Sequence, residues 1–131
     1  MNDPINRADR PDDLRTLFVE LAPAGDADAL ARLYEPGAIM AFPPGRLTEG
    51  REAIRAIWGA VIEVGVPITL EPAMPTLVCG SIALTGTVRA DGIGVRVQVV
   101  RRQPDGSWLR VIDVPEMTPR PPTPTGEGSR S

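Results

Sequence analysis

Asp113 is the residue of this 131-residue chain that is best placed to take part in proton transfer. The pattern of residues 108–114 predicts a strand, and in a regular strand Asp113 shares one face with Leu109 and Val111. A carboxyl group held among apolar side chains can serve as a general acid or base. If Asp113 instead pairs with Arg96, it would orient a ligand or a water molecule. If it only accepts backbone hydrogen bonds at a strand end, its role is structural.

The composition excludes most other catalytic chemistry. The chain has no histidine, which removes Ser-His and Cys-His pairs and most zinc or non-haem iron sites. It also has no glycine-rich phosphate loop. The single cysteine, Cys79, cannot form an internal disulfide, and its apolar neighbours predict a buried, unreactive thiol. We therefore expect no cofactor and no metal.

The charge pattern limits the partners. The net charge is −3, and acidic and basic residues are interspersed, so no basic stripe is present to bind nucleic acid. No apolar run approaches the ~20 residues that cross a bilayer. We expect no nucleic-acid or membrane partner and a cytoplasmic location.

The elements that position Asp113 are predicted to form one domain, residues 10–115, between a flexible N-terminus (1–9) and a disordered, proline-rich tail (116–131). Helical spacing of apolar residues predicts three helices. Their apolar stripes are Leu14, Leu17, Phe18 and Leu21; then Leu30, Leu33 and Tyr34; then Ile54, Ile57, Trp58, Val61 and Ile62.

A sheet is predicted to follow these helices. One short strand is expected at residues 38–42, and a four-strand meander at 68–78, 82–89, 93–102 and 108–114. Pro72 and Pro75 cannot donate to a central ladder, so the first meander strand should lie at an edge or carry a bulge.

Turn positions predict the register of the meander. A two-residue loop at Asp91-Gly92 makes Thr85 face Gln98 and Thr87 face Arg96. Asp113 then lies on the face of Arg96 and Gln98. The opposite, apolar face should contain Leu84, Val88, Val95, Val97, Val99, Trp108 and Ile112.

Three sequence strings, in this order, resemble the nuclear-transport-factor-2-like superfamily. They are residues 25–30 leading to Leu33-Tyr34, residues 50–54, and residues 105–108 leading to Asp113. The resemblance covers roughly residues 10–115 and is closest to the SnoaL-like, polyketide-cyclase-like branch. It implies an α+β fold in which a cone-shaped, curved mixed or antiparallel sheet wraps around three N-terminal helices, as in a cystatin-like α+β barrel.

The resemblance also implies a pocket for a small hydrophobic molecule and a homodimer through the other sheet face. Besides Asp113, the expected pocket residues are Phe18, Tyr34, Met40, Phe42, Trp58, Arg96, Gln98 and Val111. Ketosteroid isomerases of this fold use a carboxylate base, a tyrosine and a protonated aspartic acid. Phe18, Phe42 and Gln98 stand at the corresponding positions here, which disfavours that mechanism.

Three functions stay open at this point. The chain could be a non-catalytic protein that binds a hydrophobic metabolite. It could be a cyclase- or isomerase-type enzyme in which Asp113 transfers a proton. It could also be a structural dimer whose pocket is vestigial.

Overall fold

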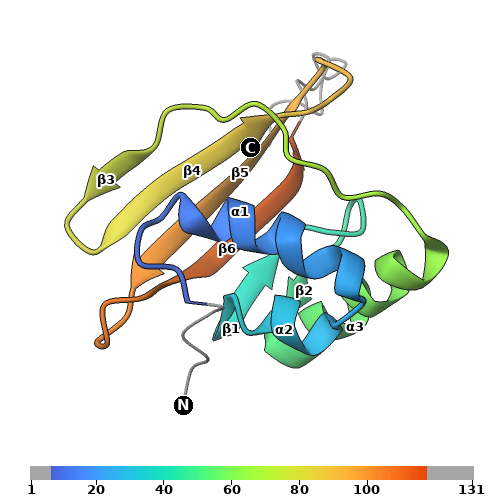
Figure 1. Cartoon of the computed structure of the whole chain (residues 1–131), viewed down its shortest axis with the longest axis horizontal. Coiled ribbons are helices and arrows are strands. Elements are labelled where there is room, and N and C mark those ends of the chain that lie inside the picture. The colour runs from blue at the N-terminus through green and yellow to red at the C-terminus, as the bar shows by residue number, and fades with distance from the viewer. Residues whose placement is uncertain (1–6, 118–131) are drawn as a thin grey trace, which may run out of the picture.

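The computed structural model describes residues 7–117. The elements, in chain order, are α1 (Asp13–Leu21), the short 3-10 helix η2 (Ala22–Ala24), α2 (Ala27–Ala31), β1 (Tyr34–Met40), β2 (Thr48–Glu49), α3 (Arg51–Val64), β3 (Leu77–Cys79), β4 (Ile82–Val88), β5 (Val95–Arg102) and β6 (Trp108–Met117). The helices lie on one side of the sheet, and α1 crosses its face (Figure 1).

The six strands form one mixed sheet in the order β2-β1-β6-β5-β4-β3. β1 runs parallel to β6, and every other pair is antiparallel. The predicted α+β fold with three helices and a curved sheet is confirmed. The sheet does not close into a barrel, because β2 and β3 remain as its two edges.

The second helix is shorter than predicted. α2 ends at Ala31, and Tyr34 is the first residue of β1 rather than part of a helical stripe. The backbone carbonyl of Leu33 accepts a hydrogen bond from Arg110 N at 2.8 Å. The chain therefore pairs with β6 at this point, and the helix does not continue. The register of β1 shifts between Tyr34 and Ile39, which allows Pro36 within the strand.

The first meander strand is also shorter than predicted. Only Leu77–Cys79 forms β3, and it lies at the sheet edge, as the prolines of this region predicted. Residues 66–76, which we call the strap, run from the end of α3 across to β3 (Figure 1). The strap contacts β4 through Met74 N and Gly86 O at 2.8 Å.

The core lies between the helices and the inner face of the sheet. Its fully buried members include Leu14, Leu30, Leu33, Tyr34, Met40, Ile54 and Val100. Trp108 also belongs to this core, 6% exposed, so its assignment to the outer face was wrong. The prediction of a buried thiol was likewise wrong, because Cys79 is exposed on the edge strand.

The outer face of the sheet is apolar. One cross-strand row joins Leu77, Leu84, Val99, Ile112 and Ile39 by direct pairing. Leu77, Leu84 and Ile112 are 63%, 43% and 40% exposed, respectively. We call this row, with its neighbours Val88, Val95, Val97, Val114 and Met117, the outer apolar face.

The described chain begins and ends close to the predicted domain limits. Ala8 is buried, and its carbonyl accepts a hydrogen bond from Trp108 N at 2.9 Å, so packing starts slightly before residue 10. The predicted flexible residues 1–6 and the tail residues 118–131 lie outside the described residues. Among residues 7–117, no helix combines the length and the apolar character that crossing a membrane requires.

Candidate functional site

A cavity of about 400 Å³ lies between α1, α3, the strap and the inner face of the sheet. α1 and α3 supply an apolar wall, and the sheet supplies most of the polar groups. The lining residues are Arg15, Phe18, Val19, Met40, Phe42, Ile57, Trp58, Val61, Val66, Pro67, Ile68, Thr69, Glu71, Thr87, Arg96, Gln98, Arg110, Asp113, Pro115 and Glu116. An adjoining hollow of about 470 Å³ shares Phe42 and Glu116 with it.

Most residues predicted for the pocket meet in this cavity. Phe18, Met40, Phe42, Trp58, Arg96, Gln98 and Asp113 all line it. Tyr34 does not line it, because its side chain is fully buried behind the wall. Val111 does not line it either.

A bulge in β6 explains the position of Val111. Val99 pairs with Ile112, but the next β5 residue, Val100, pairs with Arg110, so Val111 is an extra residue without a partner in β5. The predicted alternation is therefore reversed before the bulge, and Arg110 shares the inner face with Asp113. Arg110 is only 7% exposed and lines the cavity where Val111 was expected.

The predicted register of β4 and β5 is confirmed. Thr85 pairs with Gln98, and Thr87 pairs with Arg96. The Thr85 hydroxyl donates to Gln98 Oε1 at 2.8 Å, which leaves the Gln98 amide directed toward Asp113 Oδ1 at 3.5 Å. Asp113 itself is 2% exposed.

Asp113 belongs to a buried polar cluster. The Tyr34 hydroxyl donates to Asp113 Oδ2 at 2.5 Å and accepts hydrogen bonds from Trp58 Nε1 at 3.1 Å and from Arg110 Nη1 at 3.3 Å. Arg110 Nη1 also lies 3.5 Å from Asp113 Oδ2. Oδ2 of Asp113 thus has the short hydrogen bond from Tyr34 and the charge of Arg110 nearby, while among residues 7–117 Oδ1 has only the 3.5 Å contact with Gln98.

Electrostatics fix the charge of this cluster. Burial, together with the neighbouring Asp113, raises the pKa of Tyr34 far above its ordinary value, so the phenol stays protonated. Burial opposes the charge on Arg110, but its interactions with Tyr34 and Asp113 outweigh that effect and raise its pKa. The arrangement provides a fixed cation beside a carboxylate acceptor.

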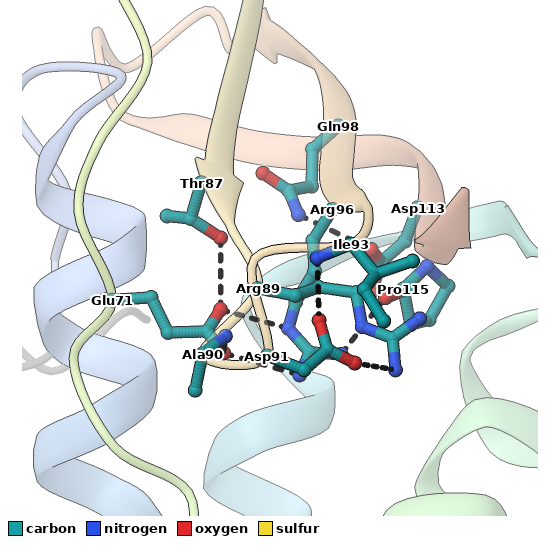
Figure 2. Close-up of polar contacts among 10 residues, drawn as sticks. All are labelled: Glu71, Thr87, Arg89, Ala90, Asp91, Ile93, Arg96, Gln98, Asp113 and Pro115. Atoms are coloured by element: carbon teal, nitrogen blue, oxygen red, sulfur yellow. Dashed lines mark hydrogen bonds and ion pairs between the residues drawn. The ribbon is translucent and has the colours of Figure 1, made fainter. Parts of the chain in front are cut away.

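Arg96 does not pair with Asp113, although the register predicted that possibility. Figure 2 shows Arg96 turned toward the strap, where it makes two hydrogen bonds with Glu71, at 2.8 and 3.1 Å. It also donates to the carbonyl of Pro115 at 2.8 Å. Burial acts against the charged form of Glu71, but Arg96 and Thr87 outweigh it and lower the pKa of Glu71. The pair holds the strap against the sheet.

Arg110 and Arg15 are among the site residues that were missed at the level of sequence. Arg110 was not predicted, because regular alternation from Asp113 would place it on the outer face and nothing in residues 108–114 indicates a bulge. Arg15 lies one helical turn before Phe18 on α1, and that spacing could have placed it beside the pocket. Within residues 7–117, acidic and cysteine side chains form no cluster that could hold a metal ion.

Comparisons with known proteins agree with this geometry. The SnoaL-like domain family matches residues 15–117. A search of curated protein sequences gave no significant match. An NTF2-like protein with a cystatin-like fold from Novosphingobium aromaticivorans is 24% identical, with a TM-score of 0.56, over 78% of this chain and 75% of that one.

Two further solved structures share the fold. A ketosteroid isomerase-like protein from Erwinia carotovora is 15% identical, with a TM-score of 0.64, over 82% of this chain and 94% of that one. A candidate dehydratase of the NTF2-like family from Streptomyces avermitilis is 19% identical, with a TM-score of 0.62, over 80% of this chain and 92% of that one. The family match shows that this chain belongs to the SnoaL-like domain family, and its fold is that of the NTF2-like proteins with a cystatin-like fold.

Proposed function

We propose that this protein binds a small hydrophobic molecule in the cavity between α1, α3 and the sheet. The observation that carries the proposal is the lining itself. Phe18, Met40, Ile57, Trp58 and Val61 form an apolar wall. Most polar groups lie on the opposite, strand side, and the others are Arg15 on α1 and Thr69 and Glu71 on the strap. A concave apolar site with few polar groups is the usual form of a small-molecule site.

Asp113 supplies the polar anchor of this site. Its Oδ2 is occupied by Tyr34 and Arg110, whereas Oδ1 has only the 3.5 Å contact with Gln98. Because a carboxylate oxygen can accept more than one hydrogen bond, Oδ1 can take a hydroxyl or amide of the bound molecule. Tyr34 and Arg110 hold the carboxylate in place for that contact.

The alternative is an enzyme in which Asp113 accepts a proton from the bound molecule, as in a cyclase or isomerase. The same Oδ1, which accepts only the 3.5 Å contact from Gln98 among the described residues, favours it. Phe18 and Phe42 carry no exchangeable proton, and of the other lining carboxylates Glu71 is paired with Arg96 and Glu116 is exposed to solvent. Binding without turnover is therefore the function that the arrangement supports best.

We further propose that a second copy of this chain covers the outer apolar face. An exposed apolar row that crosses five strands is larger than the scattered surface residues of a typical monomer. A twofold dimer would bury the face against itself.

A cavity-filling substitution tests the binding proposal. Val61 lines the cavity from α3, and Val64, three residues later on the same helix, is 77% exposed. Val61→Trp should lower the affinity for the neutral, fluorescent probe Nile red about tenfold, because the added ring occupies the cavity. Val64→Trp adds the same ring outside and should leave the affinity unchanged.

The outcome is read from Nile red titrations of variants with normal circular dichroism. The control also corrects for dye bound to the outer apolar face, which neither substitution touches. Equal Nile red affinity in wild type and Val61→Trp would show that the cavity is not the binding site.

A further inference from the structure

Two arginines of the cavity carry donors that no described residue satisfies. Arg110 uses one terminal nitrogen, Nη1, for its contacts with both Tyr34 and Asp113. Its Nε is buried and, among residues 7–117, has no hydrogen-bond partner. Arg15 Nε is buried in the same way, and no ion pair of Arg15 forms within those residues. Both side chains line the cavity.

Phe18 brings the two arginines to the same end of the cavity. The guanidinium carbon of Arg110 lies 4.6 Å from the centre of the Phe18 ring and 5.6 Å from that of Tyr34. Arg15 precedes Phe18 by three residues on α1, which places the two side chains next to each other on one face of the helix. Phe18 therefore has a cationic neighbour from the helix and another from β6.

Buried donors without partners cost free energy, and folded proteins rarely keep them unless water or a ligand supplies the acceptor. Aromatic rings lie against the Arg110 guanidinium, and Nη1 is occupied. The Nε–Nη2 edge of the group is what remains for a ligand, and because Nε has almost no accessible surface, the side chain must turn slightly for both nitrogens to reach it. That edge matches the two oxygens of a carboxylate, which it binds with two parallel hydrogen bonds.

The charges of the cavity favour an acceptor with one negative charge. Arg110 is balanced by Asp113, and Arg96 is balanced by Glu71 at 2.8 Å. Glu116 also lines the cavity but is exposed to solvent, where water screens its charge. Arg15 adds one positive charge that no buried carboxylate offsets. A dianion such as a phosphate would carry too much charge beside Asp113 and Glu71.

We propose that Arg15 and Arg110 bind the carboxylate of an apolar carboxylic acid, whose hydrocarbon or aromatic body fills the cavity. This inference rests on the proposed function and narrows it to a class of ligand. Arg110 supplies the two parallel donors, Nε and Nη2, and Arg15 supplies the unbalanced positive charge.

A pair of probes that differ only in charge tests this inference. 1-Naphthaleneacetate and the neutral 1-naphthaleneacetamide have nearly the same shape, and their binding can be followed by isothermal titration calorimetry. Wild type should bind the acetate at least tenfold more tightly than the amide, and this preference should fall as salt is added. Arg15→Gln should remove most of the preference without weakening binding of the amide.

Arg32→Gln is the matched control, since Arg32 is exposed at the end of α2, outside the cavity lining. It should leave the preference intact. Arg110→Lys keeps the charge but removes the pair of parallel donors, so it should weaken acetate binding more than amide binding. Equal affinities of wild type for the two probes, or a preference that survives in Arg15→Gln, would overturn the inference.

The Nile red titration shows whether the carboxylate inference alone is wrong or the proposed function is wrong as well. If Val61→Trp blocks Nile red but neither naphthalene compound binds wild type, the cavity binds apolar molecules and the carboxylate inference is wrong. If Val61→Trp leaves Nile red binding unchanged, the proposed function itself fails.

Discussion

The Tyr34 hydroxyl is the centre of the buried polar cluster. It donates to Asp113 and accepts from both Trp58 and Arg110, so its donor and its acceptor sites are all used. A buried hydroxyl whose donor and acceptor sites are all used fixes the orientation of the side chains around it. Tyr34 therefore holds Asp113 in position without reaching the cavity itself.

Alkaline titration should reveal this burial. Tyr34 is the only tyrosine of the chain, so tyrosinate absorbance reports on it alone. Its pKa is raised in the folded state, mainly by burial. The folded state therefore keeps its proton above pH 10, where an unfolded chain loses it, and stability falls as pH rises beyond 10.

The measurement is absorbance near 295 nm. We expect no tyrosinate signal in the folded protein at pH 10.5, and a signal that appears together with unfolding followed by circular dichroism. Tyrosinate that forms near pH 10 while the fold remains intact would show that Tyr34 is accessible to water.

Sequence reasoning identified Asp113, Gln98 and Arg96 because their positions follow from hairpin register, which a turn of known length determines. It placed Val111 in the pocket and missed Arg110, because a bulge depends on pairing with β5 and leaves no local signal. The sequence also did not show which charged side chains pair with each other. Glu71 pairs with Arg96 from a strap that has no regular periodicity.

At the level of elements, the strap is the least regular part of the cavity wall. The Glu71 side chain is only 10% exposed and is the main polar link between the strap and the sheet (Figure 2). The strap's backbone reaches the sheet chiefly near Met74 and Pro72. The Glu71–Arg96 pair is thus positioned to control how firmly the strap closes the cavity.

Glu71→Gln should loosen the strap. The loss of a half-buried ion pair is expected to cost about 1 kcal/mol locally, which corresponds to roughly fivefold faster amide exchange in residues 66–76. Because the pKa of Glu71 is lowered in the folded state, its contribution is present above pH 4.5 and is lost as pH falls below that value.

Hydrogen–deuterium exchange with mass spectrometry measures the effect. Glu63→Gln, at an exposed position of α3, is the control and should leave exchange in the strap unchanged. Equal strap protection in wild type and Glu71→Gln would show that apolar packing alone holds the strap.

Gly86 of β4 marks a close approach of the strap. A Cβ at this position would lie 2.9 Å from the Arg96 carbonyl oxygen and 3.3 Å from Met74 Sδ. Gly86→Ala should therefore destabilise the fold by about 1–3 kcal/mol in urea denaturation. Gly37 in β1 has no atom within 4 Å of such a Cβ, and Gly37→Ala should not destabilise it. A Gly86→Ala protein as stable as Gly37→Ala would show that both β5 and the strap shift to make room for the methyl group.

Whether a segment forms a helix or a strand was more predictable than the residues at which it begins and ends. The stripe of α3 and the strands β4 to β6 follow from periodicity over many residues. The end of α2 does not, because Leu33 and Tyr34 continue its helical spacing while pairing with β6 draws them into the sheet. Tertiary pairing overrides local preference at such junctions.

At the scale of the whole molecule, the proposed dimer rests on the outer apolar face. Leu84 lies within the face and is 43% exposed, whereas Leu47 is 62% exposed on the loop between β1 and β2. Leu84→Lys should convert a dimer to a monomer in sedimentation velocity at micromolar concentration, because a lysine cannot be buried there without a partner. Leu47→Lys should leave the dimer intact. A monomeric wild type would contradict the proposed interface.

The bulge in β6 also affects how this chain should be aligned with its relatives. In a regular strand two residues that face the same cavity are an even number of positions apart, yet Arg110 and Asp113 are three apart and share one face. A relative with an unbroken strand would carry the equivalent arginine two positions before its aspartate. Ungapped alignment would then match Arg110 to an outward residue, so a one-residue gap at Val111 is needed before conservation of the pair can be judged.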